Sequence, residues 1–168
     1  MNYTQRALAM VAAATLLSGC DTVTSMANGV TNPMTPEQSK AQVIAAATDV
    51  SKAVGQPVAS ANFSRSSCND QGDAPFRGVV NIFYAAPTDP AAAASEFDQM
   101  KQRLQSAGWA GDSEFKSHGT TLKKSDVDAV LLPADASVAK VQITLYGECR
   151  DMTTTKAQAG VGEAITLG

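Results

Sequence analysis

Residues 76–86 read FRGVVNIFYAA, and this stretch is apolar on both faces of an extended chain. Successive side chains of a strand point to opposite sides, so Val80 and Ile82 share one face, whereas Val79 and Phe83 share the other. Apolar side chains on both faces are typical of a strand in the middle of a sheet. The chain is therefore predicted to fold around a sheet that has this segment as a central strand.

Two segments have the apolar spacing and the end residues of one-faced helices. The first begins with TPEQ at 35–38, which has the form of a capping box, and it ends at Gly55. The second begins after Asp89, a suitable N-cap, and ends at Gly108. Its apolar face consists of Ala93, Phe97, Met100 and Leu104. Each helix has a single apolar stripe and is expected to cover one side of the sheet.

The other predicted strands lie within residues 57–68, 109–117, 120–133 and 139–149. The last two are joined by PADAS, which is short enough for a hairpin. The predicted fold class is therefore α+β. We expect a two-layer sandwich in which two helices cover one face of an antiparallel sheet of about five strands, in the order α-β-β-α-β-β-β.

The N-terminal region has an apolar run at residues 7–17 that ends in Leu-Ser-Gly-Cys at 17–20. A membrane-spanning helix needs about 20 apolar residues, so this run fits the core of a signal peptide instead. The final four residues resemble the bacterial lipobox, whose cysteine thiol is alkylated by a diacylglycerol. We therefore predict a lipoprotein signal peptide at 1–19 and a lipidated Cys20 that carries palmitate or similar chains. The alternative is a plain secreted protein with a chance cysteine.

This interpretation divides the chain into four parts. Residues 20–35 comprise the acylated cysteine and a flexible tether, because 21–35 are polar and small without an apolar period. Residues 36–150 form the single α+β domain, and the remaining tail at 151–168 is predicted to be disordered. The expected location is the cell membrane, with the domain lipid-anchored on the extracytoplasmic side of the envelope.

The charge balance restricts the partners. The chain has 13 basic and 16 acidic residues, and loss of residues 1–19 removes only Arg6, which leaves a net charge of −4. Such a surface offers no electrostatic attraction for nucleic acid, so nucleic acid is excluded as a partner. The expected partners are the membrane, through Cys20, and a lipid, cell-wall or protein ligand.

Two cysteines remain in the mature chain, Cys68 and Cys149. An exported chain meets oxidising conditions, so the even pair predicts a disulfide. The alternative, a metal site, lacks support because the two cysteines are far apart in sequence and the chain has a single histidine. No metal and no cofactor are expected.

Several residue groups are candidate chemical sites. His118 lies near two serines, so a hydrolase triad is conceivable, but its position before a glycine is typical of a solvated turn, and the chain has no G-x-S-x-G motif. Two pairs of carboxylates are candidate cation ligands: Asp126 with Asp128, and Asp70 with Asp73. The first pair favours a polar strand face and the second a turn. Trp109 is interpreted as a core anchor rather than a ligand-stacking residue.

The layout resembles the LppA-like small lipoproteins of mycobacteria and related actinobacteria. The features in common are the lipobox at 17–20, a first helix after a short tether, Cys68 just before the VVNIFYAA strand, a second helix ending in AGW, and a last strand ending at Cys149. The resemblance implies a cell-envelope lipoprotein of uncharacterised role with a two-layer sandwich and a disulfide. That group has no assigned catalytic residues, so none is transferred to this chain.

These observations favour a protein that is not an enzyme. The predicted function is a membrane-anchored envelope lipoprotein that acts as a non-catalytic binding or interaction module. Two alternatives remain open at this point: a purely structural envelope protein, and a hydrolase that uses His118.

Overall fold

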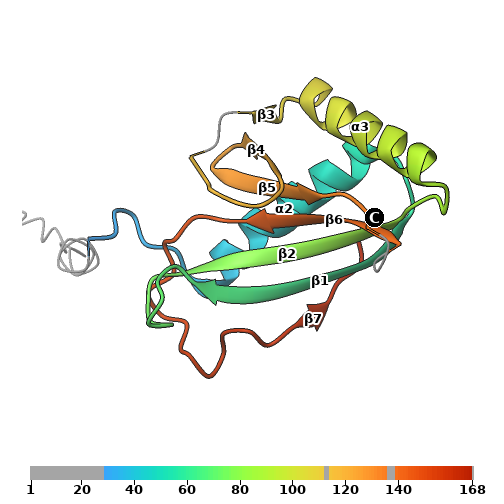
Figure 1. Cartoon of the computed structure of the whole chain (residues 1–168). Coiled ribbons are helices and arrows are strands. Elements are labelled where there is room, and N and C mark those ends of the chain that lie inside the picture. The colour runs from blue at the N-terminus through green and yellow to red at the C-terminus, as the bar shows by residue number, and fades with distance from the viewer. Residues whose placement is uncertain (1–28, 112–113, 136–138, 168) are drawn as a thin grey trace, which may run out of the picture.

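The computed structural model describes residues 29–111, 114–135 and 139–167. The signal peptide and Cys20 predicted above lie outside these residues. The described elements are α2 (Pro36–Val54), β1 (Val58–Ser67), β2 (Phe76–Ala85), α3 (Pro90–Ser106), β3 (Ala110–Gly111), β4 (Thr120–Lys124), β5 (Val127–Leu132), β6 (Lys140–Tyr146) and β7 (Glu163–Ala164). The strands form one antiparallel sheet in the order β3-β4-β5-β6-β2-β1-β7 (Figure 1). The α+β class is confirmed, although the described sheet has seven strands rather than about five.

Strand β2 lies between β1 and β6, as its two apolar faces predicted. Its inner side chains, including Val80 and Ile82, are fully buried, and Val79 on the opposite face is only 6% exposed. The opposite face also contains a hydrogen-bonded row of amides, in which Asn81 joins Asn62 of β1 and Gln142 of β6. The two faces of the sheet therefore differ: one is a continuous apolar core, and the other mixes apolar and amide side chains.

Both helices cover the apolar face. Helix α2 begins with the predicted capping box, because the Thr35 hydroxyl accepts a hydrogen bond from the Gln38 amide and the Gln38 side chain accepts one from the Thr35 amide. Figure 1 shows α2 running behind the sheet and α3 near the edge of the sheet that carries β3. Val50 of α2 and Leu104 of α3 belong to the same buried cluster as Ile143 of β6. The two-layer arrangement thus places one core between the helices and the sheet.

The segment 120–133, interpreted from sequence as a single strand, is a hairpin of β4 and β5. Ser125 and Asp126 form its two-residue turn, with backbone φ angles of 48° and 62°. Both values lie in the left-handed region that hairpin turns of this length require. Sequence patterns rely on Asn-Gly or Asp-Gly to reveal such turns, and neither pair is present here, so the turn was missed.

The C-terminal tail is the second region in which the structure differs from the sequence prediction. Residues 151–168 were predicted to be disordered, but the structure places 151–167 along the domain, where β7 pairs with β1. Asp151 is 1% exposed, and its Oδ1 accepts hydrogen bonds from the backbone amides of Thr153 and Thr154 at 2.9 and 3.0 Å. Burial raises the pKa of this carboxyl. The hydrogen bonds from the two amides and from the two threonine hydroxyls lower it by more, so the net shift is downward. The pairing of β7 with β1 joins residues about one hundred positions apart, and such a contact leaves no local periodicity to detect.

Neither helix in the described part of the chain is both long enough and apolar enough to cross a membrane.

Candidate functional site: the disulfide end of the sheet

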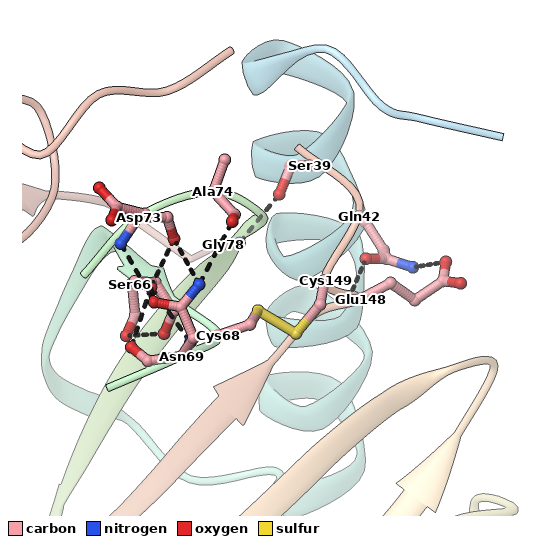
Figure 2. Close-up of a disulfide and its surroundings, with 11 residues drawn as sticks. Ser39, Gln42, Ser66, Cys68, Asn69, Asp73, Ala74, Gly78, Glu148 and Cys149 are labelled. Atoms are coloured by element: carbon pink, nitrogen blue, oxygen red, sulfur yellow. Dashed lines mark hydrogen bonds between the residues drawn. A yellow bond between two sulfur atoms is a disulfide. The ribbon is translucent and has the colours of Figure 1, made fainter. Parts of the chain in front are cut away.

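A disulfide joins Cys68, which follows β1, to Cys149, which follows β6. The two Cα atoms are 6.0 Å apart, and 81 positions separate the residues in sequence. Figure 2 shows that the start of α2 meets this end of the sheet. The Gln42 amide group donates to the Glu148 carboxylate at 2.8 Å, and the Glu148 backbone amide donates to the Gln42 side-chain oxygen at 3.1 Å. The disulfide thus lies where α2, β1 and β6 come together.

An open groove of about 410 Å³ lies beside the disulfide, and Cys149 forms part of its wall. The wall also includes Val30 and Thr31, from the segment that leads into α2. Its charged lining consists of Arg77, Lys123, Arg150, Asp126, Asp128 and Glu148. Positive and negative side chains are equally represented, so the groove is neither a polyanion site nor a typical cation site.

Arg77 of β2 is the most unusual side chain of this groove. Its guanidinium carbon lies 5.1 Å from the centre of the Phe115 ring and 4.9 Å from the centre of the Tyr146 ring. These two rings are stacked, with their centres 4.8 Å apart. The buried Nε of Arg77 has no hydrogen-bond partner among the described residues. Burial lowers the pKa of this guanidinium, and the charges of Tyr146 and Asp128 oppose that shift.

The sheet register explains why these residues meet. Tyr146 of β6 is opposite Val79 of β2 on one side and Asp128 of β5 on the other. Asp128 is in turn opposite Lys123 of β4. Side chains that are directly opposite on neighbouring strands share a face, so a row of charged and aromatic groups crosses the sheet at this end.

Arg150, another basic side chain of the groove, is held by polar contacts. The guanidinium of Arg150 pairs with the Glu148 carboxylate at 3.0 Å, and its Nε donates to the backbone oxygen of Asn32 at 2.6 Å. Arg150 therefore fixes the wall of the groove. Arg77 instead packs against the Phe115 and Tyr146 rings, near the opposite charge of Asp128, and its buried Nε has no hydrogen-bond partner among the described residues.

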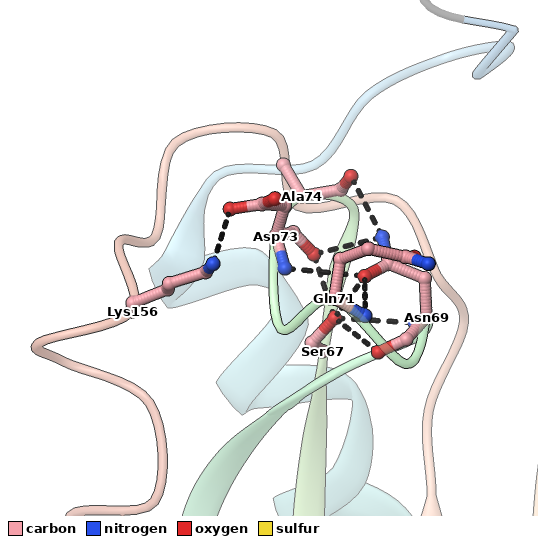
Figure 3. Close-up of polar contacts among 6 residues, drawn as sticks. All are labelled: Ser67, Asn69, Gln71, Asp73, Ala74 and Lys156. Atoms are coloured by element: carbon pink, nitrogen blue, oxygen red, sulfur yellow. Dashed lines mark hydrogen bonds and ion pairs between the residues drawn. The ribbon is translucent and has the colours of Figure 1, made fainter.

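The loop 67–74 does not form the cation cradle that Asp70 and Asp73 suggested. Figure 3 shows the Asn69 side chain in the middle of this loop. Its oxygen accepts from the backbone amides of Gln71 and Asp73, both at 3.1 Å, and its nitrogen donates to the backbone oxygens of Asp73 and Ala74. The Asp73 carboxylate instead pairs with Lys156 at 3.1 Å. Within the described ranges, no group of three or more histidine, cysteine or acidic residues could hold a metal ion.

The other sequence candidates are dispersed. His118 is exposed in the loop before β4, and no hydrogen bond joins it to Ser117 or Ser125 in the described part of the chain. Asp126 is in the β4–β5 turn, whereas Asp128 lies on β5, so both reach the groove but they do not form a calcium loop.

Trp109 is a core residue, with 1% of its surface exposed. Its indole nitrogen donates to the Asp49 carboxylate at 2.9 Å, and Lys124 donates to the same oxygen at 2.8 Å. The Lys124 hydrogen bond is the main reason that the pKa of Asp49 is lowered, and desolvation partly opposes it. Because the folded pKa is depressed, this contact stabilises the fold at neutral pH and is lost as the pH falls through the folded pKa of Asp49.

Sequence reasoning missed Arg77, Phe115 and Tyr146. One signal was available for Arg77: in FRGVVNIFYAA its alternation places it on the same face as Val79, which is the face away from the helices. No local pattern could show that Phe115, from the loop after β3, stacks on Tyr146, because the contact spans about thirty residues of sequence.

These features are those of one class of protein, the small lipoproteins, in which a disulfide-bonded α+β domain follows a lipobox-like motif. Comparison identifies the family. The family described as "Putative lipoprotein LppJ" matches residues 35–168, and the chain belongs to this family. Lipoproteins of the same description from Mycobacterium bovis and Mycobacterium tuberculosis are 32% identical to it over 165 residues, which cover 91% of this chain and 86% of each relative.

The LppA-like resemblance was therefore correct at the level of mycobacterial lipoproteins, but the family that matches is LppJ. The family description names no reaction and no ligand. No solved structure matches the chain.

Proposed function

We propose that this lipoprotein is a non-catalytic binding module and that the groove beside the Cys68–Cys149 disulfide is its ligand site. One observation carries the proposal: the Arg77 guanidinium lies against the Phe115 and Tyr146 rings, and its Nε has no hydrogen-bond partner among the described residues. A buried polar group without a partner is costly, so natural proteins keep one mainly where it serves a purpose. Binding of a ligand is such a purpose.

The residues of the groove indicate the chemistry of the ligand. A guanidinium that is fixed by aromatic rings presents its donors in a planar fork, which matches a carboxylate or a phosphate. The neighbouring Asp126 and Asp128 would repel a second anionic group and would attract a cationic one. The groove is therefore suited to a small ligand with one anionic group and a nearby cationic or neutral polar group.

The position of the groove fits a ligand that is near the membrane. Val30 and Thr31 line it, and the predicted lipid anchor Cys20 is only about ten residues earlier in the sequence. A fully extended segment of that length spans at most about 35 Å, so an anchored domain would keep the groove within that distance of the bilayer. Lipid headgroups and cell-wall fragments are available there.

Replacing Arg77 with glutamine is expected to reduce ligand occupancy at least tenfold, because the amide cannot provide the charged fork. The measurement is native mass spectrometry of the full lipoprotein, purified in detergent from its own host, in which a bound ligand appears as a constant added mass. Lys101→Gln is the matched control, since Lys101 pairs with Asp98 on α3 and does not line the groove. Equal occupancy in the Arg77 variant, or no added mass in any form, would contradict the binding role and favour a structural one.

Replacing Cys20 with alanine is expected to move the protein from the membrane fraction to the soluble fraction, or to leave the unprocessed precursor. The thiol of Cys20 is the group of the lipobox that is readily alkylated to a stable thioether, and two or more acyl chains are needed for stable anchoring. Fractionation followed by immunoblotting measures the distribution. Unchanged membrane attachment of a processed Cys20→Ala chain would show that the anchor is elsewhere.

A further inference from the structure

A second pocket, of about 330 Å³, lies between α2 and the β4–β5 hairpin. We call it the helix-side pocket. Its walls include Ala45 and Ala46 of α2, Val127 of β5 and Trp109, which follows α3. Val127 and Trp109 are 2% and 1% exposed, whereas Ala45 lies at the surface. The helix-side pocket therefore extends from the surface of the domain to its apolar core.

The charged side chains of the helix-side pocket are bound within the protein. The Lys124 ammonium donates to the Asp49 carboxylate and to the Ala107 backbone oxygen, both at 2.8 Å. The Trp109 indole nitrogen donates to the same carboxylate oxygen at 2.9 Å. Because these polar groups already have partners, the pocket offers a ligand mainly apolar contacts. In this it differs from the groove, where the buried Nε of Arg77 has no partner among the described residues.

Only a thin wall separates the helix-side pocket from the groove. Ser125 and Asp126 are the consecutive residues of the β4–β5 turn, and Ser125 lines the pocket whereas Asp126 lines the groove. Beside the turn, Gln42 of the pocket and Glu148 of the groove are joined by two hydrogen bonds (Figure 2). Consecutive Cα atoms are about 3.8 Å apart. Both turn residues are exposed, so a chain molecule bound in the groove can cross the turn and enter the pocket.

We propose that the ligand is a phospholipid, with its phosphate on Arg77 in the groove and one acyl chain in the helix-side pocket. This inference rests on the proposed function, in which the groove is the ligand site. A polar groove beside an apolar pocket matches an amphiphile, whereas a cell-wall saccharide has no apolar chain to place in the pocket. The groove, at about 410 Å³, and the pocket each have a volume within the range of ligand sites. The predicted anchor at Cys20, about ten residues before Val30 of the groove wall, keeps both sites near a bilayer that contains such lipids.

Photo-cross-linking tests where the acyl chain lies. The full lipoprotein is incorporated into vesicles of phosphatidylethanolamine and phosphatidylglycerol, in which either lipid carries a diazirine in the middle of one acyl chain. Illumination, digestion and mass spectrometry then locate the label, which we expect on segments 42–49 and 124–127. Ala45→Phe is expected to reduce this label about tenfold, because the added ring takes up space that the chain needs.

Ala41→Phe is the matched control. Ala41 is one turn earlier on the same side of α2 and is exposed like Ala45, but it does not line the helix-side pocket. This variant should keep the full label. Because both substitutions are at exposed positions, both variants should have the urea midpoint of the natural protein, which excludes unfolding as the cause of a lost label.

Arg77→Gln distinguishes this inference from the proposed function. If one phospholipid occupies both sites, Arg77→Gln reduces the label in the pocket as well, because the chain enters together with its headgroup. Label that is absent from 42–49 and 124–127 with both lipids, or that Ala45→Phe leaves unchanged, would overturn the inference. The groove would still be the ligand site if Arg77→Gln removes the added mass in native mass spectrometry. Label that decreases with Ala45→Phe but not with Arg77→Gln would overturn the link between pocket and groove.

Discussion

Replacing both Cys68 and Cys149 with alanine is expected to lower the free energy of unfolding by about 4.5 kcal/mol. The disulfide closes a loop of 81 residues, and the chain-entropy relation assigns this value to the restriction it places on the unfolded chain. Natural domains are stable by about 5–15 kcal/mol in total, so the loss is a large share of the whole. Urea unfolding of the mature chain, followed by circular dichroism, measures it.

The reduced natural protein is the control, because it keeps both side chains and loses only the bond. It should unfold at nearly the same urea concentration as the double alanine variant. Two backbone hydrogen bonds near the disulfide do not involve the cysteine sulfurs. The Phe76 amide donates to the Asp151 oxygen at 2.7 Å, and the Met34 amide donates to the Arg150 oxygen at 2.8 Å. The fold should therefore remain native below the transition. A loss below 1 kcal/mol would show that the unfolded chain is already constrained at this point.

The sequence predicted the parts of this structure that have local causes. The capping box of α2, the two faces of β2 and the N-cap of α3 at Asp89 each depend on residues a few positions apart, and each is present. The β4–β5 turn at Ser125 and Asp126 has no such local pattern and was missed.

The groove and the pairing of the C-terminal segment 155–167 with β1 were missed for a different reason. The Arg77 environment combines side chains from β2, β6 and the loop after β3, and residues 160–165 meet β1 through backbone hydrogen bonds to Arg65 and Ala61. Backbone hydrogen bonds do not select particular side chains, so a strand formed mainly through them leaves little trace in the sequence. The binding role and the lipid anchor remain proposals that the experiments above decide.

Replacing Gly78 with alanine is expected to destabilise the fold by about 3 kcal/mol, an effect at the upper end for overpacking. A Cβ at this position would lie 2.7 Å from the backbone oxygen of Ser39 and 2.8 Å from a methyl group of Val43, both on α2. Real Cβ atoms do not approach a carbonyl oxygen so closely, so α2 would have to move. That movement would also weaken the 2.9 Å hydrogen bond from the Gly78 amide to the Ser39 hydroxyl.

Two other glycines make this prediction specific. At Gly147 the nearest atoms, 2.8 and 2.9 Å from an added Cβ, belong to the side chains of Gln42 and Val43 rather than to the backbone, so Gly147→Ala should cost less than Gly78→Ala. At Gly111 nothing lies within 4 Å, so Gly111→Ala should change stability by no more than about 0.5 kcal/mol. The urea midpoint should therefore be highest for Gly111→Ala, lower for Gly147→Ala and lowest for Gly78→Ala. Equal midpoints for the three variants would mean that α2 packs less closely on β2 than the Gly78 contact implies. The close approach matters for the groove as well, because Gly78 is adjacent to Arg77 and a displaced α2 would move Gln42 away from Glu148.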